Sequence, residues 1–190
     1  WIVKTDSARN IQWQHSFGGT KNEEALAVRE TPEGDFVFVG TSFSNDGDIT
    51  NHHGTTTTSD VWLFKLSAAG SLVWQKSFGG TANDEGTDLD ICMDGGYILS
   101  GFTSSVDGDI TSTHGGADHW IIKTDTAGNI LWQKTIGGTA DDEANCIAID
   151  SFGNIYIAGH FSKTLYLDSA NSSINLQGSS GSMFLVKFDS

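Results

Sequence analysis

The sequence predicts an all-β protein made of β-propeller blades, each a four-stranded antiparallel unit, with only part of a propeller in this chain. Three observations predict this class: a repeat of about 60 residues, four short β-like runs in each repeat, and a recurring Gly and aromatic signature. The composition agrees, because 23 Gly, 11 Phe and 6 Trp stand beside a single Pro among 190 residues. No segment shows the 3.6-residue apolar period of a helix.

The repeat is clearest in three segments that align without a gap. They read "WIVKTDSARNIQWQHSFGGT" at 1–20, "WLFKLSAAGSLVWQKSFGGT" at 62–81 and "WIIKTDTAGNILWQKTIGGT" at 120–139, and "FLVKFDS" at 184–190 begins a fourth copy. Between them, each repeat keeps a glutamate and a glycine at a fixed distance: Glu24 and Gly40, Glu85 and Gly101, Glu143 and Gly159. A β-helix has a much shorter period and a single sandwich does not repeat so closely, so blades are the favoured interpretation.

The middle repeat shows the four predicted strands of a blade. The β-like runs are 86–92, 97–102, 119–124 and 130–135. "MDGG" and "DTAGN" separate them as hairpin turns, in which Gly supplies a positive φ. The longer "SSVDGDITSTHGGAD" joins the second run to the third, so the longest loop of each blade is expected at that connection.

We expect residues 1–190 to be a single propeller segment that starts and stops inside a blade. The expected divisions are the last two strands of a blade at 1–19, one blade at 20–80, one at 81–138, and an incomplete blade at 139–190. A ring normally needs about four to eight blades. The sequence is therefore either a segment of a longer chain, which is favoured, or one of several copies that complete a ring.

Two acidic loops resemble a calcium-binding sequence, "SNDGDITNHHG" at 44–54 and "SVDGDITSTHG" at 105–115. An EF-hand is excluded, because the glycine and the glutamate that it requires at its sixth and twelfth positions are missing. A looser Ca²⁺ site that combines carboxylates with backbone carbonyls is predicted as the one metal candidate, and no other cofactor is predicted. Its ligands would be Asp46, Asp48, Asp107 and Asp109. The favoured alternative is a turn held by Asx hydrogen bonds.

The sequence predicts no enzyme. The patterns G-x-S-x-G and H-E-x-x-H and a phosphate-binding glycine loop are absent. Glu24, Glu85 and Glu143 each follow another acidic residue, and paired carboxylates can perform acid–base chemistry. Because the pair recurs in every repeat whereas a catalytic centre is normally unique, a hydrogen bond between blades is favoured. A glycan-active enzyme that uses Asp84 or Asp142 is the alternative.

The recurring tryptophans and the net charge narrow the range of partners. Trp13, Trp74 and Trp132 are expected in the core, with sugar-stacking platforms as the alternative. The formal charge of −14 repels phosphate backbones and anionic lipid, so no nucleic-acid partner is expected. No run approaches the roughly 20 apolar residues of a membrane span, so no membrane insertion is expected.

The stretch "GGTADDEANCIAIDSFGNIYIAGHFSKTLYLD" at 137–168, followed by "SMFLVKFD", resembles the SBBP repeats, a bacterial seven-bladed β-propeller repeat family. The "DGDIT…HG…D-x-W-x-x-K" units are similar to variants in large secreted bacterial surface proteins. One departure is Ser182, which stands where the two preceding repeats have Asp60 and Asp118.

The resemblance covers nearly the whole chain and implies an exported bacterial protein at the cell surface or outside the cell. It implies a non-catalytic scaffold for binding or adhesion, whose partner is a protein or a glycan at that surface. The alternative is a structural, self-assembling spacer of a larger surface protein or filament, whose partners are further copies or blades of itself.

Overall fold

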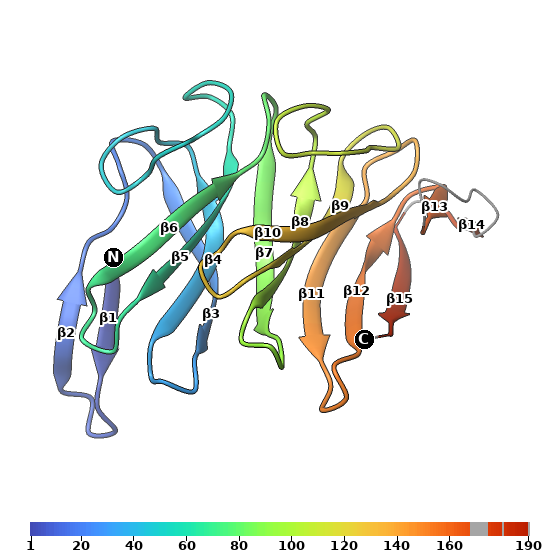
Figure 1. Ribbon diagram of the computed structural model, residues 1–190. Coiled ribbons are helices and arrows are strands. Elements are labelled where there is room, and N and C mark those ends of the chain that lie inside the picture. The colour runs from blue at the N-terminus through green and yellow to red at the C-terminus, as the bar shows by residue number, and fades with distance from the viewer. Residues whose placement is uncertain (168–174, 180, 190) are drawn as a thin grey trace.

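The computed structural model describes residues 1–167, 175–179 and 181–189 (Figure 1). These residues form fifteen β-strands, and no helix occurs among them. Neighbouring strands pair antiparallel within separate sheets, and none of the sheets closes into a barrel. The predicted all-β class with four-stranded antiparallel blades is therefore confirmed.

Two sheets are four-stranded units in which the order along the sheet is the order along the chain. The first blade consists of β3 (Glu23–Glu30), β4 (Phe36–Ser42), β5 (Asp60–Leu66) and β6 (Leu72–Phe78). The second blade consists of β7 (Asp84–Ile91), β8 (Tyr97–Thr103), β9 (Asp118–Thr124) and β10 (Ile130–Ile136). The tight turns between these strands place Gly at positive φ, for example Gly70 at +82° and Gly128 at +77°, as the turn sequences predict.

The remaining strands form smaller sheets at the two ends of the described chain. The N-terminal hairpin pairs β1 (Ile2–Thr5) with β2 (Ile11–His15). The third blade has three described strands, β11 (Glu143–Ile149), β12 (Ile155–Phe161) and β15 (Ser182–Phe188). A short extra hairpin, β13 (Thr164–Tyr166) and β14 (Asn175–Gln177), lies between β12 and β15 in sequence and was not predicted.

Apolar layers hold the blades face to face. Between the first and second blades, Val37 and Leu63 pack in one cluster with Leu89 and Trp120. A second cluster joins the second and third blades, and a third one joins the N-terminal hairpin to the first blade. The first strands β3, β7 and β11 contact one another in sequence order, so the blades fan out from them as sectors of a propeller (Figure 1).

The recurring glutamate and glycine meet across the first two strands of each blade. Gly40 pairs with Ala25, and Gly101 pairs with Gly86, next to a register shift in the first strand. A Cβ on Gly40 would lie 1.8 Å from the carbonyl oxygen of Glu24, and one on Gly101 would lie 2.0 Å from that of Glu85. The glycine is thus required because the backbone of the neighbouring strand fills the space of a side chain.

Candidate functional site

The two acidic loops lie at the same end of the molecule, at the top of Figure 1. The first loop, residues 43–59, joins β4 to β5, and the second loop, residues 104–117, joins β8 to β9. These are the connections at which the sequence predicts the longest loops. Asp46 and Asp48 belong to the first loop, and Asp107 and Asp109 to the second.

In the first loop both aspartates fasten the chain to the "GGT" turn that precedes the first blade. Asp46 accepts hydrogen bonds from the backbone N–H and the hydroxyl of Thr20, each at 2.8 Å. Asp48 accepts one from the Gly18 N–H at 3.0 Å, and its own N–H donates to the Gly18 carbonyl at 3.0 Å. We call this set of contacts the first clasp.

The second loop repeats the arrangement on the turn before the second blade. Asp107 accepts hydrogen bonds from the N–H and the hydroxyl of Thr81, at 2.7 and 2.8 Å. Asp109 accepts one from the Gly79 N–H at 3.1 Å and donates its own N–H to the Gly79 carbonyl at 2.9 Å. This is the second clasp. The hydrogen bonds from Thr81 lower the pKa of Asp107, and those from Thr20 lower the pKa of Asp46 in the same way.

These contacts limit how well the four aspartates suit a cation. Ca²⁺ takes about six to eight oxygen ligands, whereas both oxygens of Asp46 and of Asp107 already accept hydrogen bonds. Within the described residues, no group of three or more His, Cys, Asp or Glu side chains is placed to share a metal ion. The geometry therefore fits a structural clasp better than a metal site, and Ca²⁺ binding stays a prediction.

The Asx-turn alternative needs revision as well. The clasp hydrogen bonds reach residues 26 and 30 positions earlier in the chain instead of closing the loop on itself. In the third blade, which lacks the "DGDIT" sequence, Tyr166 of β13 takes over part of this role: its N–H donates to the Gly137 carbonyl at 2.8 Å, and its carbonyl accepts the Gly137 N–H at 3.3 Å. The turn before each blade is thus fastened in all three cases, with or without carboxylates.

We expect Asp107→Ala to free the second turn. Without the carboxylate, the Thr81 N–H loses its acceptor, so its amide should exchange with solvent faster in an NMR hydrogen-exchange measurement. Asp107→Asn keeps one acceptor oxygen, so its exchange rate at Thr81 should lie between those of the unaltered chain and Asp107→Ala. Unchanged exchange at Thr81 in Asp107→Ala would contradict the clasp. Added Ca²⁺ that slows this exchange in the unaltered chain, but not in Asp107→Ala, would instead support the metal prediction.

A second set of carboxylates is buried at the starts of the blades. Asp84 accepts hydrogen bonds from the Gly80 N–H at 2.8 Å and the Ser105 hydroxyl at 2.7 Å. Asp142 accepts the Gly138 N–H at 2.7 Å and the Ser162 N–H at 2.8 Å. Burial raises the pKa of both carboxyls above the usual range for aspartate. Each of these aspartates, named as alternatives for catalysis, therefore holds a glycine turn in its own blade.

Asp60 and Asp118 begin the third strand of each complete blade and are fully buried. Asp60 accepts the His53 N–H at 2.7 Å, and Asp118 accepts the His114 N–H at 2.5 Å. Burial raises the pKa of both carboxyls, that of Asp118 to about 6. Ser182 replaces them in the third blade, where its hydroxyl accepts the Ser179 N–H at 3.0 Å.

One histidine approaches the geometry of a catalytic pair. The His53 Nδ1 lies 2.9 Å from the Asp60 carboxylate, and its Nε2 lies 3.8 Å from Asp109. A hydrolase would also need a nucleophile next to the histidine. Among the described residues, no Ser, Thr or Cys side chain hydrogen-bonds to the His53 ring. The His53 ring thus lies between Asp60, at the start of β5, and Asp109 of the second loop.

Within the described residues, the recurring glutamates Glu24, Glu85 and Glu143 are not seen to form the hydrogen bond between blades that the sequence predicted. Glu85 is half-buried, and its pKa is raised first by burial and then by the negative charges of Glu24 and Glu143. Neighbouring blades thus bring these side chains together as like charges. Instead, the acidic residue before each of these glutamates accepts hydrogen bonds. Glu23, for example, accepts one from the Gly19 N–H at 3.0 Å.

Glu85→Gln is expected to raise the melting temperature at pH 7 by about 2 °C. A carboxyl whose folded-state pKa is raised costs stability when it is ionised, and this cost disappears as the pH falls through that pKa. The gain should therefore be present at pH 7 and be lost near pH 4 in a thermal melt followed by circular dichroism. Glu30→Gln, at an exposed position of β3, is the control. A gain that grows toward acidic pH would contradict the repulsion.

Comparisons with known proteins agree with this architecture. Residues 132–160, which run from β10 to β12, match the SBBP family, described as a β-propeller repeat. A Caulobacter vibrioides protein named regulatory protein FlaEY is 31% identical over 111 residues, which are 53% of this chain and 11% of that protein. An uncharacterized WD repeat-containing protein, L264, of Acanthamoeba polyphaga mimivirus is 28% identical over 166 residues, 70% of this chain and 12% of that protein.

The chain thus spans about an eighth or less of the length of either relative. The family predicted from the "GGTADDEANCIAID…" stretch is the one that the comparison finds, and the match covers the end of the second blade and the start of the third. Residues 132–160 of the chain therefore match one β-propeller repeat of the SBBP type.

Proposed function

We propose that this chain is part of a non-catalytic β-propeller scaffold, exported to a bacterial cell surface, whose long loops bind a protein or a glycan. One observation carries the proposal. Aspartates that recur in the repeats, Asp46 with Asp107 and Asp84 with Asp142, hold turns at equivalent places of successive blades, which is a structural use of these carboxylates. The names of the relatives, a regulatory protein and a WD repeat-containing protein, agree with a scaffold.

The loop tips supply the binding surface in this proposal. The clasps fix the base of each loop, whereas Thr55, Thr56 and Thr57 of the first loop and Val106 of the second are exposed. Val106 is 77% exposed and is therefore available for contact with a partner. No helix within the described residues has the length and apolar character needed to cross a lipid bilayer.

The test is a glycan array and a pull-down from surface extracts, both with the unaltered chain. Val106→Glu should reduce the recovery of the partner at least about tenfold, which corresponds to about 1.4 kcal/mol of binding free energy. Val73→Glu is the matched control, because Val73 is also exposed but lies on β6, away from the loops. If neither assay finds a bound glycan or protein, or if both variants reduce the recovery of the partner equally, the proposal is wrong.

A structural spacer is the second candidate, and the repetition of the same clasp from one blade to the next favours it. Light scattering distinguishes the candidates, because a self-assembling spacer should form dimers or longer assemblies. A strictly monomeric chain would exclude self-assembly.

A further inference from the structure

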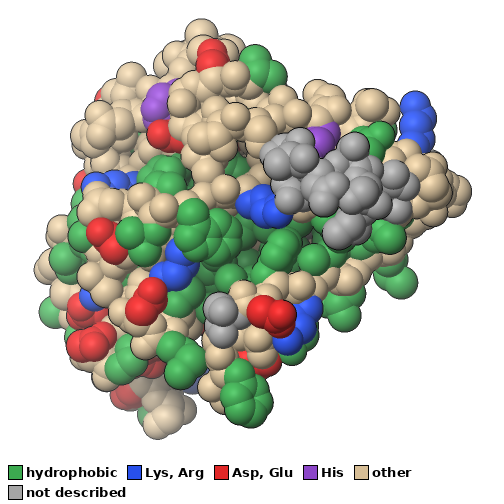
Figure 2. Space-filling view, turned by 45° about the vertical axis from the view of Figure 1, so that its right-hand side comes forward, with side chains coloured by type: hydrophobic (Ala, Val, Ile, Leu, Met, Phe, Trp, Pro, Cys, Tyr) green, Lys and Arg blue, Asp and Glu red, His purple; other side chains and the backbone are tan. Residues whose placement is uncertain are grey.

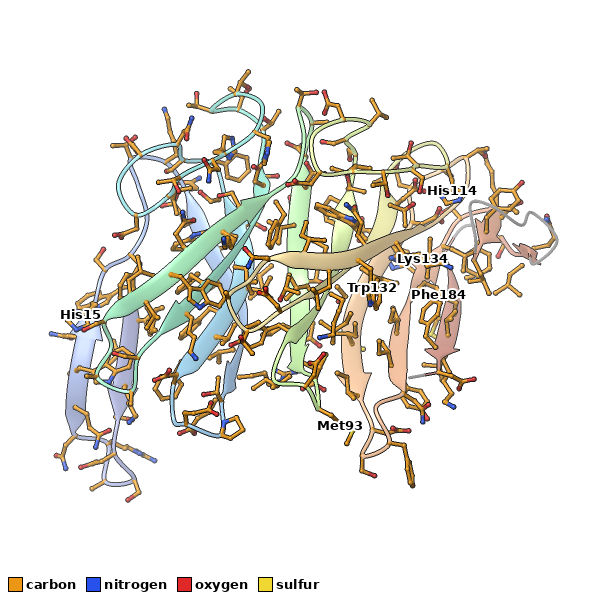
Figure 3. The ribbon with its side chains drawn as sticks, viewed as in Figure 1. His15, Met93, His114, Trp132, Lys134 and Phe184 are labelled. Carbon is orange, nitrogen blue, oxygen red and sulfur yellow. The ribbon has the colours of Figure 1, made fainter. Side chains whose placement is uncertain are left out.

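A cavity of about 460 Å³ lies between the turns of the first and second blades. Three turns border it, at residues 31–35, 92–96 and 125–129. Met93 lines this cavity, and Figure 3 shows Met93 at the lower end of the molecule, whereas His114 of the second loop lies near the upper end. The cavity is therefore enclosed by elements of two complete blades, at the end of the molecule opposite the acidic loops.

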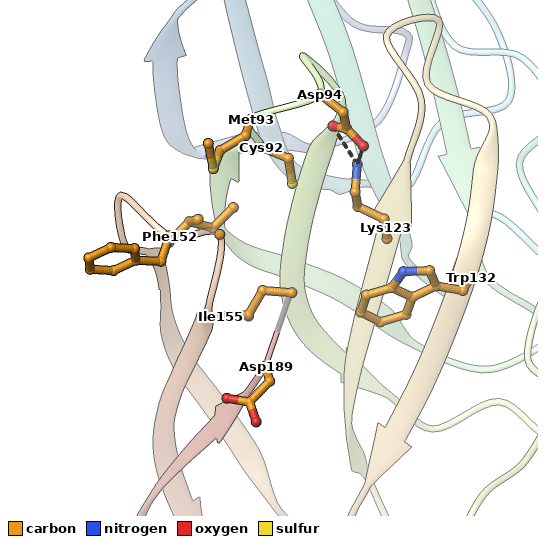
Figure 4. Close-up of a pocket in the computed structure, with 10 residues that line it drawn as sticks. Cys92, Met93, Asp94, Lys123, Trp132, Phe152, Ile155 and Asp189 are labelled. Carbon is orange, nitrogen blue, oxygen red and sulfur yellow. Dashed lines mark hydrogen bonds and ion pairs between the residues drawn. The ribbon is translucent and has the colours of Figure 1, made fainter.

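The same place is hollow at the next junction, so the feature belongs to the repeat. A cavity of about 320 Å³ between the second and third blades is lined by Cys92 and Lys123 (Figure 4). These two residues are the repeat equivalents of Thr31 and Lys65, which line the first cavity. Figure 2 shows the second place as a hollow with hydrophobic side chains, beside lysine side chains.

Hydroxyl groups are the available hydrogen-bonding groups of the first cavity. Thr31 is 6% exposed, and its Oγ1 has no hydrogen-bond partner among the described residues. Tyr97 is 1% exposed and packs its ring 5.9 Å from the ring of Trp74, which holds the phenol in place. Burial raises the pKa of Tyr97, so its hydroxyl stays protonated at neutral pH. Because a buried hydroxyl without a partner destabilises the fold, a ligand that bonds to Thr31 removes this cost.

The buried charges of the wall are already paired with each other. The Lys65 Nζ lies 3.0 Å from the Asp35 carboxylate, and its hydrogen bond lowers the pKa of Asp35. Lys123 and Asp94 form the same kind of pair at the next junction, at 2.9 Å (Figure 4). A charged ligand would meet a like charge of this pair, whereas the hydroxyl groups of a ligand can bond to Lys65 without separating it from Asp35.

The rest of the first cavity is mainly apolar. Pro32, Ile91 and Met93 supply this part of its lining. Small-molecule sites of about 300–1,000 Å³ typically combine such an apolar lining with a few placed polar groups. The cavity thus offers hydroxyls and a paired lysine for polar contacts, together with an apolar surface for C–H groups.

We propose that this cavity binds one uncharged, hydroxyl-rich unit, a single sugar residue. The hydroxyls of Thr31 and Tyr97 exchange hydrogen bonds with hydroxyls of the sugar, and Lys65 donates a further one. Ile91 and Met93 contact the C–H groups of the sugar ring. This site is independent of the loop tips proposed above, because it lies at the other end of the molecule.

The test titrates the methyl glycosides of glucose, galactose, mannose and N-acetylglucosamine into the unaltered chain, followed by NMR of the backbone amides. A dissociation constant of about 1 mM is expected for a ligand of this size. The amide signals of Thr31, Cys92 and Gly95 should shift saturably with at least one of these sugars. If none of them gives saturable shifts, the proposal is wrong. Shifts confined to the loops at 43–59 and 104–117 would also overturn it, and would support the loop-tip function instead.

Thr31→Val makes the test specific to the cavity. The variant should bind the sugar about fivefold more weakly, because it lacks the hydroxyl. Its melting temperature without sugar should stay the same or rise, because a buried group without a partner is removed. Thr41→Val is the matched control: the Thr41 Oγ1 is also buried without a partner among the described residues, but Thr41 does not line the cavity. Unchanged affinity in Thr31→Val, or an equal loss in both variants, would overturn the assignment.

Two charged sugars test whether the ligand is uncharged. Glucosamine carries an ammonium group at mildly acidic pH, and glucuronate carries a carboxylate. Each should bind more weakly than methyl glucoside, because Lys65 and Asp35 already neutralise each other. Tighter binding of either charged sugar would show that the site selects a charge, and would overturn the assignment of an uncharged ligand.

Discussion

Gly101→Ala is expected to lower the free energy of unfolding by about 4 kcal/mol or more, a very large loss for the addition of one methyl group. The added Cβ would lie 2.0 Å from the carbonyl oxygen of Glu85 on the paired strand, and a backbone atom cannot move aside as the end of a side chain can. Relief would require β7 and β8 to separate at the register shift beside Gly86, in the middle of the second blade. Urea unfolding at pH 7 measures the loss.

The control for Gly101→Ala is a glycine with free space around it. Gly181 has a φ of +77° and no atom within 4 Å of an added Cβ, so Gly181→Ala should cost only about 1 kcal/mol of backbone strain. A similar loss in both variants would show that alanine is tolerated at Gly101 and that the contact with Glu85 is not what requires the glycine.

Asp84→Ala is expected to cost about 3 kcal/mol, somewhat less than Gly101→Ala. The carboxylate accepts hydrogen bonds from the Gly80 N–H and the Ser105 hydroxyl, and the substitution leaves both donors buried without an acceptor. Asp84→Asn retains an acceptor oxygen and should cost less than alanine. Urea unfolding of both variants at pH 7 tests this order, and a cost for alanine no greater than for asparagine would contradict it.

The pH dependence of Asp84→Asn gives an independent check. Burial raises the pKa of Asp84, so its ionised form costs stability above the unfolded-state pKa, and this cost is lost as the pH falls through the folded-state pKa. As the pH falls from 7 through the folded-state pKa of Asp84, the unaltered chain should therefore gain stability relative to Asp84→Asn. Asp125→Asn should show the opposite sign at lower pH. Hydrogen bonds from Asn129 lower the pKa of Asp125, so the unaltered chain loses this stabilisation only as the pH falls below the ordinary aspartate pKa of 3.8. A trend of the same sign in both variants would contradict the two assignments.

The blades were predictable because their signals are local. Turns such as "DTAGN" and strands of apolar residues two apart lie within a few residues of each other, and the repeat shows each signal more than once. The hairpin of β13 and β14 was missed because, in the part of the chain that the structure describes, it occurs in the third repeat alone, where no second copy supports it. The clasps were missed because a carboxylate and its donors are 26 to 30 residues apart.

The roles within the acidic pairs could not be assigned from sequence. Asp84 and Glu85 are adjacent in a strand, where successive side chains point to opposite sides. The strand places Asp84 against the glycine turn and Glu85 beside Glu24 and Glu143, and the pair alone does not say which member points which way. Trp132 shows the same limit, because sequence equivalence to Trp13 and Trp74 predicted a core residue, whereas burial depends on what the neighbouring blade supplies.

The clasps also bear on how such a chain can change its length. Each clasp closes within 30 residues, from Gly18 to Asp48 and from Gly79 to Asp109, and the stretch between Asp48 and Gly79 belongs to neither. A duplication or deletion can begin in this stretch and end at the equivalent place of another repeat. Each clasp that remains then keeps both its aspartates and their hydrogen-bond donors. The exchange of whole repeats between such crossover points therefore does not separate these donors from their acceptors.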